Sequence, residues 1–350
     1  MTILIFLLML AVLILVHEAG HFAVAKASKV TVKEFGLGFG PRIVGITRGG
    51  TLYSLNLVPL GGFVKMVGEE DPSEPGSLAS KPLGIRALVL GAGGLMNVVL
   101  PIILIAASLM LPHQALTESV IINEVAAGSP AQRAGLQAGD TILSMDGHAV
   151  ENRGEVAYRI ALRFGSDVKL TLKGVDNRTR TVEVVPRWNP PPGQGPIGIT
   201  LGAGDSKIGT VSTPVWKAFP EGARITWETF VLFKNEIEGW FIRRTAPQLS
   251  GPVGIAQVTG EVARAGISPV LRFAALLSLN LAIFNFLPLP ALDGGRLAFV
   301  ALEWVRRGIR ISPRKEGLVH LIGFIVLLAI MAVVTYLDIA RIIAGQRLIP

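Results

Sequence analysis

Cysteine is absent from all 350 positions of the chain. Disulfide bonds and thiolate metal sites are therefore excluded, so any zinc site must be built from histidine and carboxylate side chains. Charged residues are also scarce, at 17%, whereas half of the residues are apolar. The mean hydropathy of +0.54 is typical of a membrane protein rather than a soluble one.

The net charge of +8 does not indicate a nucleic-acid-binding protein, because Lys and Arg cluster beside apolar stretches. Basic residues are dense in segments 26–86 and 296–315. The positive-inside rule predicts that both segments are cytoplasmic. The N-terminus, the long region 112–272 and the C-terminus are then expected on the outer side.

Four apolar stretches predict membrane-spanning segments, at about residues 2–25, 87–111, 273–287 and 318–337. Three of them are near or above the roughly 20 residues that cross a bilayer as a helix. The third is shorter and ends at two prolines, so irregular backbone is expected to follow it. The first could be mistaken for a signal peptide, but it lacks a basic start, and we expect a retained helix.

The first stretch contains His17, Glu18 and His21 in the pattern H-E-x-x-H. Two histidines four residues apart lie on one helix face, about 6 Å apart along the axis. Both can bind one metal ion, and the intervening glutamate can act as general base on the attacking water. Ionisable side chains at membrane depth are costly and usually functional, so this motif predicts a zinc hydrolase site inside the membrane.

A catalytic zinc site of this kind needs a third protein ligand. The candidates near membrane depth are Asp293, Glu303 and His320. Asp293 follows the prolines of the third stretch, which descends about 22 Å from the outer face and so reaches a depth similar to that of His17. Glu303 and His320 are better explained as an interfacial charge and a helix-end histidine.

Other polar residues in the spans allow more than one role. Asn280 and Asn285 could bond to each other or to neighbouring helices, or Asn285 could donate to substrate or to a developing oxyanion. The glycine-rich run 91–97 should allow close helix approach, and we expect Asn97 to be structural.

Alternating apolar residues predict a β-hairpin in segment 51–66, with a break and turn at Pro59 and Gly61-Gly62. Its open edge near Ser54 to Leu57 could capture an extended substrate, or the hairpin could only plug the cytoplasmic face. The residues expected to contact substrate are Tyr53, Ser54, Leu55, Asn56 and Leu57.

The outer region alternates short strands and helices. Strands are expected at 118–125, 141–145, 168–172 and 181–185, and helices at 129–135 and 153–163. The run S-P-A-x-x-A-G-L-x-x-G-D at Ser129–Asp140 resembles a PDZ domain, which implies peptide binding by strand addition. A size filter or docking platform is the alternative.

Segment 195–199 could be a carboxylate-binding turn or a closing strand. Aromatic and basic residues in 215–250 suit helices at the membrane interface or packing against the outer domain.

Taken in order, these motifs resemble the bacterial site-2 proteases of the regulator-of-sigma-E protease group, which are intramembrane zinc metalloproteases. They are His17–His21, Gly38–Pro41, Tyr53–Lys65, Ser250–Ile255 and Asn285–Gly295. The resemblance implies His17, His21 and Asp293 as Zn²⁺ ligands and Glu18 as catalytic base. It also implies substrate binding by Asn285 and by a membrane-reentrant hairpin. One PDZ domain is expected, where the best-known member has two.

The expected fold is a polytopic α-helical membrane protein with four transmembrane helices, a cytoplasmic-side β-hairpin and an extracytoplasmic α+β PDZ domain. The expected domains are 1–111 with H-E-x-x-H and the hairpin, 112–210 as the PDZ domain, 211–270 as interfacial helices, and 271–350 with the L-D-G motif. The implied location is the bacterial cytoplasmic (inner) membrane.

The implied substrates are single-span membrane proteins, such as an anti-sigma factor already trimmed outside or a remnant signal peptide. The PDZ domain could also bind a peptide C-terminus, and no nucleic-acid partner is expected. Two other functions fit part of the sequence: a membrane-anchored PDZ scaffold with a non-catalytic zinc site, and a transporter-like protein. The first half of the chain has no second Pro/Gly-broken segment, which counts against the transporter.

The ligand assignment can be tested by metal analysis. Asp293→Ala should lose most of the bound zinc because it removes a ligand, whereas His320→Ala should retain it. Measuring zinc per protein in the two purified variants separates the candidates, and the reverse result would overturn the assignment.

Overall fold

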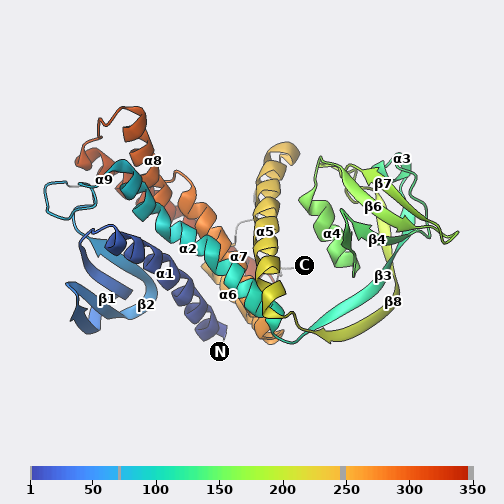
Figure 1. The fold of residues 1–350 in the computed structure, drawn as a ribbon, viewed down its shortest axis with the longest axis horizontal. Coiled ribbons are helices and arrows are strands. Elements are labelled where there is room, and N and C mark those ends of the chain that lie inside the picture. Colours follow the sequence, from blue (N-terminus) through green and yellow to red (C-terminus); the bar gives the residue numbers. More distant parts are fainter. Residues whose placement is uncertain (1, 70–71, 245–249, 346–350) are drawn as a thin grey trace. The chain divides into compact units, whose positions relative to one another are not determined.

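The computed structural model describes residues 2–69, 72–244 and 250–345. The parts of the predicted domains 1–111, 211–270 and 271–350 that fall on the remaining residues lie outside this description. The chain divides into two compact units (Figure 1). The first comprises 1–108, 215–226 and 249–350, and the second comprises 109–214 and 227–248. The predicted segment 211–270 is thus shared between the two units.

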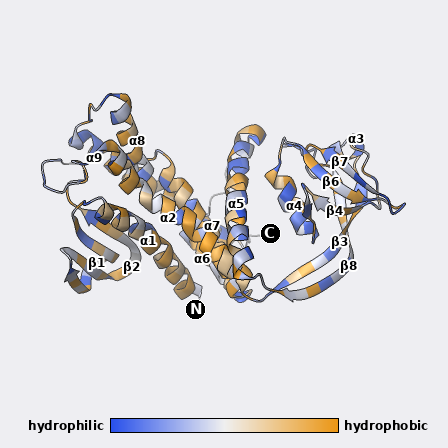
Figure 2. Ribbon diagram, viewed as in Figure 1, coloured by the Kyte–Doolittle hydropathy of each residue, from blue (hydrophilic) through white to orange (hydrophobic). Residues whose placement is uncertain are grey.

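Four helices of the first unit are long and apolar enough to cross a membrane, which confirms the four predicted stretches. They are α1 (Thr2–Ala27), α2 (Leu83–Met110), α7 (Ile267–Phe286) and α9 (Pro313–Ile343). Hydrophobic residues run along their lengths (Figure 2). The most apolar stretch of α9 has no residue buried inside the protein. Side chains that are apolar and yet unburied are what a lipid environment favours, so the unit is that of a membrane protein.

Helices α1 and α2 approach each other closely. A Cβ atom at Gly20 would lie 2.5 Å from the carbonyl oxygen of Ala92, so only glycine fits there. Met9 and Leu13 of α1 also form a buried cluster with Leu100 of α2 and Ala274 of α7. These contacts fix the relative positions of the three helices around the middle of α1.

A small sheet of the first unit joins β1 (Val32–Arg48) to β2 (Thr51–Met66). The apolar alternation of segment 51–66 predicted the hairpin, whereas its pairing with β1 was not predicted. Phe35 is paired with both Tyr53 and Val64, and residues 34–37 therefore lie between two parts of β2, 52–55 and 62–65. The chain turns back between these parts, as predicted at Pro59 and Gly61-Gly62, and Gly61 has a φ of +104°.

The same register corrects the position of the free edge. Tyr53 is paired with Phe35 on one side and Ile46 on the other, and Leu55 is likewise paired with Leu37 and Val44. The prediction of an open edge near Ser54 to Leu57 is therefore wrong for Ser54 and Leu55, which have strand partners on both sides. Among the described strands, the part of β2 at 62–65 has a partner on one side only. A sequence pattern cannot reveal this, because the second partner comes from a strand that turns back.

Irregular backbone follows α7, as the prolines predicted. The loop leads into α8 (Asp293–Val305), with Ala291 at a φ of +74°. The main-chain N–H of Ala291 donates to His320 Nδ1 of α9 at 2.9 Å. A Cβ atom at Gly323 would lie 2.2 Å from Pro290 Cβ, so α9 packs directly on the loop. The loop that precedes Asp293 is thus supported by a neighbouring helix.

The second unit contains a six-stranded sheet with the order β7-β6-β4-β3-β8, and β5 pairs with β4. Its strands are β3 (His113–Val125), β4 (Thr141–Met145), β5 (His148–Ala149), β6 (Val168–Lys173), β7 (Thr179–Val184) and β8 (Ile199–Val211). Its two short helices are α3 (Pro130–Arg133) and α4 (Arg153–Leu162). All the strands and helices predicted for this region are present, within a few residues of their expected ends.

Two local features of this sheet follow from the sequence. Ser129 caps α3 by accepting the N–H of Gln132, and Gly135 ends the segment at a φ of +77°. Ile199, which the sequence left as part of a turn or a closing strand, begins strand β8, which pairs along β3. The length of β8 was not predicted, because residues 200–211 lack a strong apolar alternation.

Helix α5 (Val215–Arg243) forms most of the predicted aromatic and basic segment and is followed by α6 (Pro252–Arg264). Within the second unit, Tyr158 of α4 donates to Glu228 at 3.0 Å, and Asn235 donates to the Ala161 carbonyl at 2.8 Å. These contacts show that this part of α5 packs against α4 within the second unit. Its location at a membrane interface stays a prediction.

Glu303 lies in a buried ion network rather than at a metal site. Arg86 donates to it at 2.6 Å and Arg310 at 2.9 Å. Burial alone would raise the pKa of Glu303, but the hydrogen bonds from Arg86 and Arg310 lower it below the ordinary value of 4.5. The stabilisation from this carboxylate is therefore complete at neutral pH and is lost as the pH falls below 4.5 through the folded-state pKa.

Glu303→Ala should destabilise the protein by about 3–5 kcal/mol, because it leaves the Arg86 guanidinium buried without its carboxylate. Glu74→Ala is the matched control, since Glu74 pairs with Lys33 at the surface, where both side chains are about half exposed. That control should change stability by about 1 kcal/mol or less. Thermal unfolding in detergent measures both, and equal effects would contradict the structural role of Glu303.

Candidate metal centre

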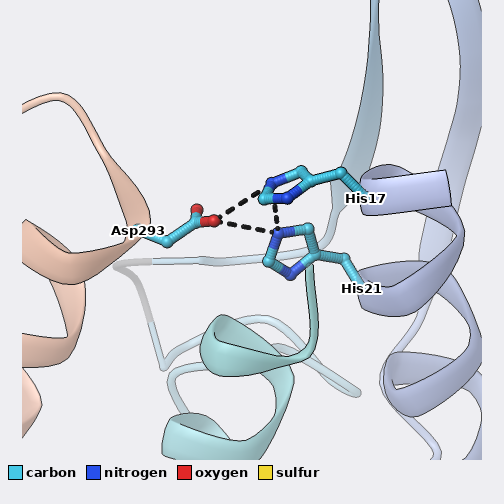
Figure 3. Close-up of side chains that lie close together, drawn as sticks. All are labelled: His17, His21 and Asp293. Carbon is cyan, nitrogen blue, oxygen red and sulfur yellow. Dashed lines mark hydrogen bonds and ion pairs between the residues drawn. The ribbon is translucent and has the colours of Figure 1, made fainter. Parts of the chain in front are cut away.

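Three side chains from distant parts of the first unit converge on one point (Figure 3). His17 Nε2 and His21 Nε2 are 3.2 Å apart, and Asp293 Oδ2 lies 3.1 Å from each of them. The two histidines come from adjacent turns of α1, whereas the aspartate is the first residue of α8. The helix break after α7 is what turns this carboxylate toward α1.

The donor atoms suit a zinc ion. Two imidazole nitrogens and one carboxylate oxygen form a common catalytic zinc ligand set, which leaves a fourth position for water or substrate. The ring of His21 is already oriented for this role, because its Nδ1 lies 2.8 Å from the Val89 carbonyl. A carbonyl can only accept, so Nδ1 carries the proton and Nε2 presents its lone pair to the common point.

Helix α2 leaves room for the two imidazole rings at Gly93. A Cβ atom there would lie 2.3 Å from His21 Nε2 and 2.7 Å from His17 Nε2. Such distances are well below contact, so any larger residue would displace the ligands. The glycine run 91–97 predicted only close helix packing, and nothing in the sequence indicated this role of Gly93.

A cavity of about 300 Å³ opens beside the three side chains. Glu18 lines it from α1, and Phe63 and Val64 line it from β2. A Cβ atom at Gly62 would lie 3.2 Å from Glu18 Cγ, so the free part of β2 runs directly past this glutamate. The predicted base and a strand edge therefore share one cavity with the ligand cluster.

An ion pair between Glu69 and Arg296 forms a polar part of the cavity wall. Neither residue was among the predicted site residues. Arg296 directly follows the L-D-G-G run, which was the available signal, whereas Glu69 lies in a polar loop without a motif. The pair makes this side of the cavity suitable for water.

The other predicted residues lie outside the cavity wall. His320 supports Ala291, and Glu303 belongs to the Arg86 network, so neither is brought to the cluster. Ser54 donates to Glu34 at 2.7 Å and Asn56 donates to the Gly38 carbonyl at 2.9 Å, so both use their side chains within the sheet. Tyr53 and Leu55 line a separate apolar hollow of about 270 Å³. Leu57 is exposed, and Asn285 is half-buried at the end of α7.

Comparison with known proteins identifies the family of the chain. The model of peptidase family M50 matches residues 5–330. A Clostridium perfringens protein, provisionally named a zinc metalloprotease, is 36% identical over 335 residues, which cover 95% of this chain and 97% of that protein. The zinc metalloprotease RasP of Geobacillus kaustophilus is 30% identical over 423 residues, covering 96% of this chain and 97% of the relative.

The chain therefore belongs to peptidase family M50. It is a zinc metalloprotease, and its four apolar helices make it a membrane protein. The match to RasP extends over more positions than the 350 residues of this chain, so that relative contains insertions.

Gly93→Ala should weaken zinc binding by about 10- to 100-fold, the range typical of changes that disturb the residues around metal ligands. The added methyl group would overlap both histidine rings. Gly84→Ala in the same helix is the matched control, because nothing lies within 4 Å of a Cβ atom there. Zinc affinity measured by competition with a chelator checks this, and equal affinities for the two variants would contradict it.

Proposed function

We propose that this protein hydrolyses peptide bonds within or next to the transmembrane segments of single-span membrane proteins. The observation that carries the proposal is the ligand cluster itself. His17 and His21 lie in a helix that is long and apolar enough to span a membrane, and Asp293 meets them there. A hydrolytic site at such a depth is accessible to membrane segments rather than to soluble proteins.

In this proposal His17, His21 and Asp293 hold the zinc ion through Nε2, Nε2 and Oδ2. A zinc ion held by these residues would supply Lewis-acid polarisation of the scissile carbonyl group and would lower the pKa of a water molecule. Glu18 is adjacent to His17 in α1 and lines the same cavity. It accepts the proton of the attacking water and then donates it to the leaving amine.

The substrate must be extended at the scissile bond, because a helix shields its own peptide groups with hydrogen bonds. The edge of β2 at Gly62–Lys65 is the best candidate to hold it by strand addition. This edge has a partner on one side only and passes Glu18. It replaces the edge near Ser54 to Leu57 that the sequence suggested.

The remaining predicted substrate residues have supporting roles in this scheme. Tyr53 and Leu55 line an apolar hollow on the sheet, where side chains of a membrane segment can pack. Ser54, Asn56 and Leu57 belong to the same strand and maintain its shape or its apolar surface. Asn285 ends α7 next to the loop of Asp293, from which its amide can donate to the substrate backbone or to the developing oxyanion.

The biological role that fits this chemistry is regulated intramembrane proteolysis in the bacterial inner membrane. Substrates of this kind include an anti-sigma factor already cleaved on the outer side and a remnant signal peptide. The basic segments are then cytoplasmic and the sheet unit at 109–214 is an extracytoplasmic PDZ domain. That domain binds the new peptide C-terminus or excludes substrates that still carry a large outer domain.

Glu18→Gln should abolish cleavage while zinc remains bound. Loss of the general base lowers the rate by about 10²- to 10⁴-fold, whereas the three ligands are unchanged. Cleavage of a single-span model substrate in proteoliposomes, together with zinc content, tests this. Wild-type cleavage by the variant would refute the role of Glu18. A wild-type protein that binds zinc but cleaves no membrane substrate would favour the scaffold alternative.

A further inference from the structure

Three residues of α2, spaced four positions apart, face the two histidines. They are Val89, Gly93 and Asn97. Val89 accepts from His21 through its carbonyl, and Gly93 leaves space for both rings. Asn97 completes the series, since its amide Nδ2 lies 3.3 Å from His17 Nδ1. Each histidine of α1 therefore has a polar neighbour on α2 at the ring nitrogen that faces away from Asp293.

The amide of Asn97 has an unsatisfied atom in this arrangement. The residue is fully buried, and its Oδ1 has no hydrogen-bond partner among the described residues. An amide nitrogen beside His17 Nδ1 would donate to it, and the proton of the neutral ring would then sit on Nε2. A protonated Nε2 cannot act as a ligand, so this orientation is inconsistent with a metal at the cluster and also costs a buried acceptor.

Rotating the amide by 180° about its last bond exchanges the two atoms without changing the shape of the side chain. Oδ1 then faces His17 Nδ1 and accepts its proton, which resolves the unpaired oxygen. His17 Nε2 is left with its lone pair directed at His21 and Asp293. One rotation thus satisfies both the buried amide oxygen and the requirement of the ligand cluster.

The main chain of Asn97 is held independently by α7. In a regular helix its carbonyl would accept the N–H of residue 101, but Pro101 has none. Ser278 Oγ donates to this carbonyl at 3.0 Å instead, and both residues are fully buried. A Cβ atom at Gly94 would lie 2.8 Å from Phe286 at the end of the same helix. The helix that precedes the Asp293 loop therefore also fixes the residue beside His17.

We propose that Asn97 is a positioning residue of the metal centre. Its Oδ1 accepts the Nδ1–H of His17 and holds the imidazole in the tautomer and orientation that direct Nε2 to the ion. Val89 does the same for His21 through the main chain, which no substitution can remove. This inference rests on the ligand set of the proposed function.

Asn97→Leu and Asn97→Asp test the inference directly. Leucine has a similar size but no acceptor, so zinc affinity should fall by about 10- to 100-fold, as for other partners of metal-ligating histidines. Aspartate keeps an acceptor toward Nδ1, so its affinity should stay close to wild type. The measurement is zinc affinity by chelator competition, with the visible absorption of Co²⁺-loaded protein as a second readout of ligand geometry.

Asn280→Leu is the matched control, because it also removes an amide with a buried Oδ1 from an apolar helix, and Asn280 makes no hydrogen bond to either histidine among the described contacts. It should bind zinc as wild type does. Thermal unfolding in detergent shows whether Asn97→Leu is folded. If it is not, Asn97→Asp decides: retained affinity supports the inference, and loss of zinc overturns it, because an amide donor would then be the group that matters.

Asp293→Ala, measured alongside, separates this inference from the ligand set. Zinc retained by Asp293→Ala would refute the proposed ligands. A different result would refute only the role of Asn97. In that case Asp293→Ala loses zinc, whereas folded Asn97→Leu keeps the wild-type zinc affinity and the wild-type Co²⁺ spectrum.

Discussion

The structure depends on the cost of placing ionisable side chains among apolar helices. Two imidazoles and a carboxylate are stable at that depth only if they share a partner or bond to one another. His17, His21 and Asp293 meet this condition by converging within hydrogen-bonding distance. The same condition explains the pairing of the buried Arg86 with the buried Glu303, to which the exposed Arg310 also donates. Buried charge therefore organises the packing of the helices rather than merely being tolerated by it.

Close helix packing is the second requirement of the site. Gly20 lets α1 approach α2, Gly93 makes space for the ligand rings, and Gly323 lets α9 contact the loop before Asp293. Each glycine acts where a Cβ atom would collide with a neighbouring helix or with a ligand. Helices α1 and α2 and the loop before Asp293 are thereby held in one geometry, which a catalytic metal centre requires.

The sheet beside the site shows how function depends on pairing that is not local in sequence. The apolar alternation of β2 correctly predicted a strand, and its proline and glycines correctly predicted a turn. The edge that remains free was predicted wrongly, because β1 contributes partners to both parts of β2. One free edge of the sheet is at Gly62–Lys65, beside Glu18, and the other is at residues 44–48 of β1. The proposed strand addition is therefore placed at the Gly62–Lys65 edge, which borders the cavity of the metal centre.

Sequence alone determined the four membrane spans, the zinc-binding helix, the break after the third span and most elements of the outer sheet. These features are set by local composition and periodicity, which the printed sequence contains. The sequence already favoured Asp293 over Glu303 and His320 as the third ligand, and the tertiary structure brings Asp293 to the two histidines. It also shows that Gly93 and Asn97 lie against the two histidine rings. Their meaning comes from the helix they face, and a contact between two helices leaves no signature within either one.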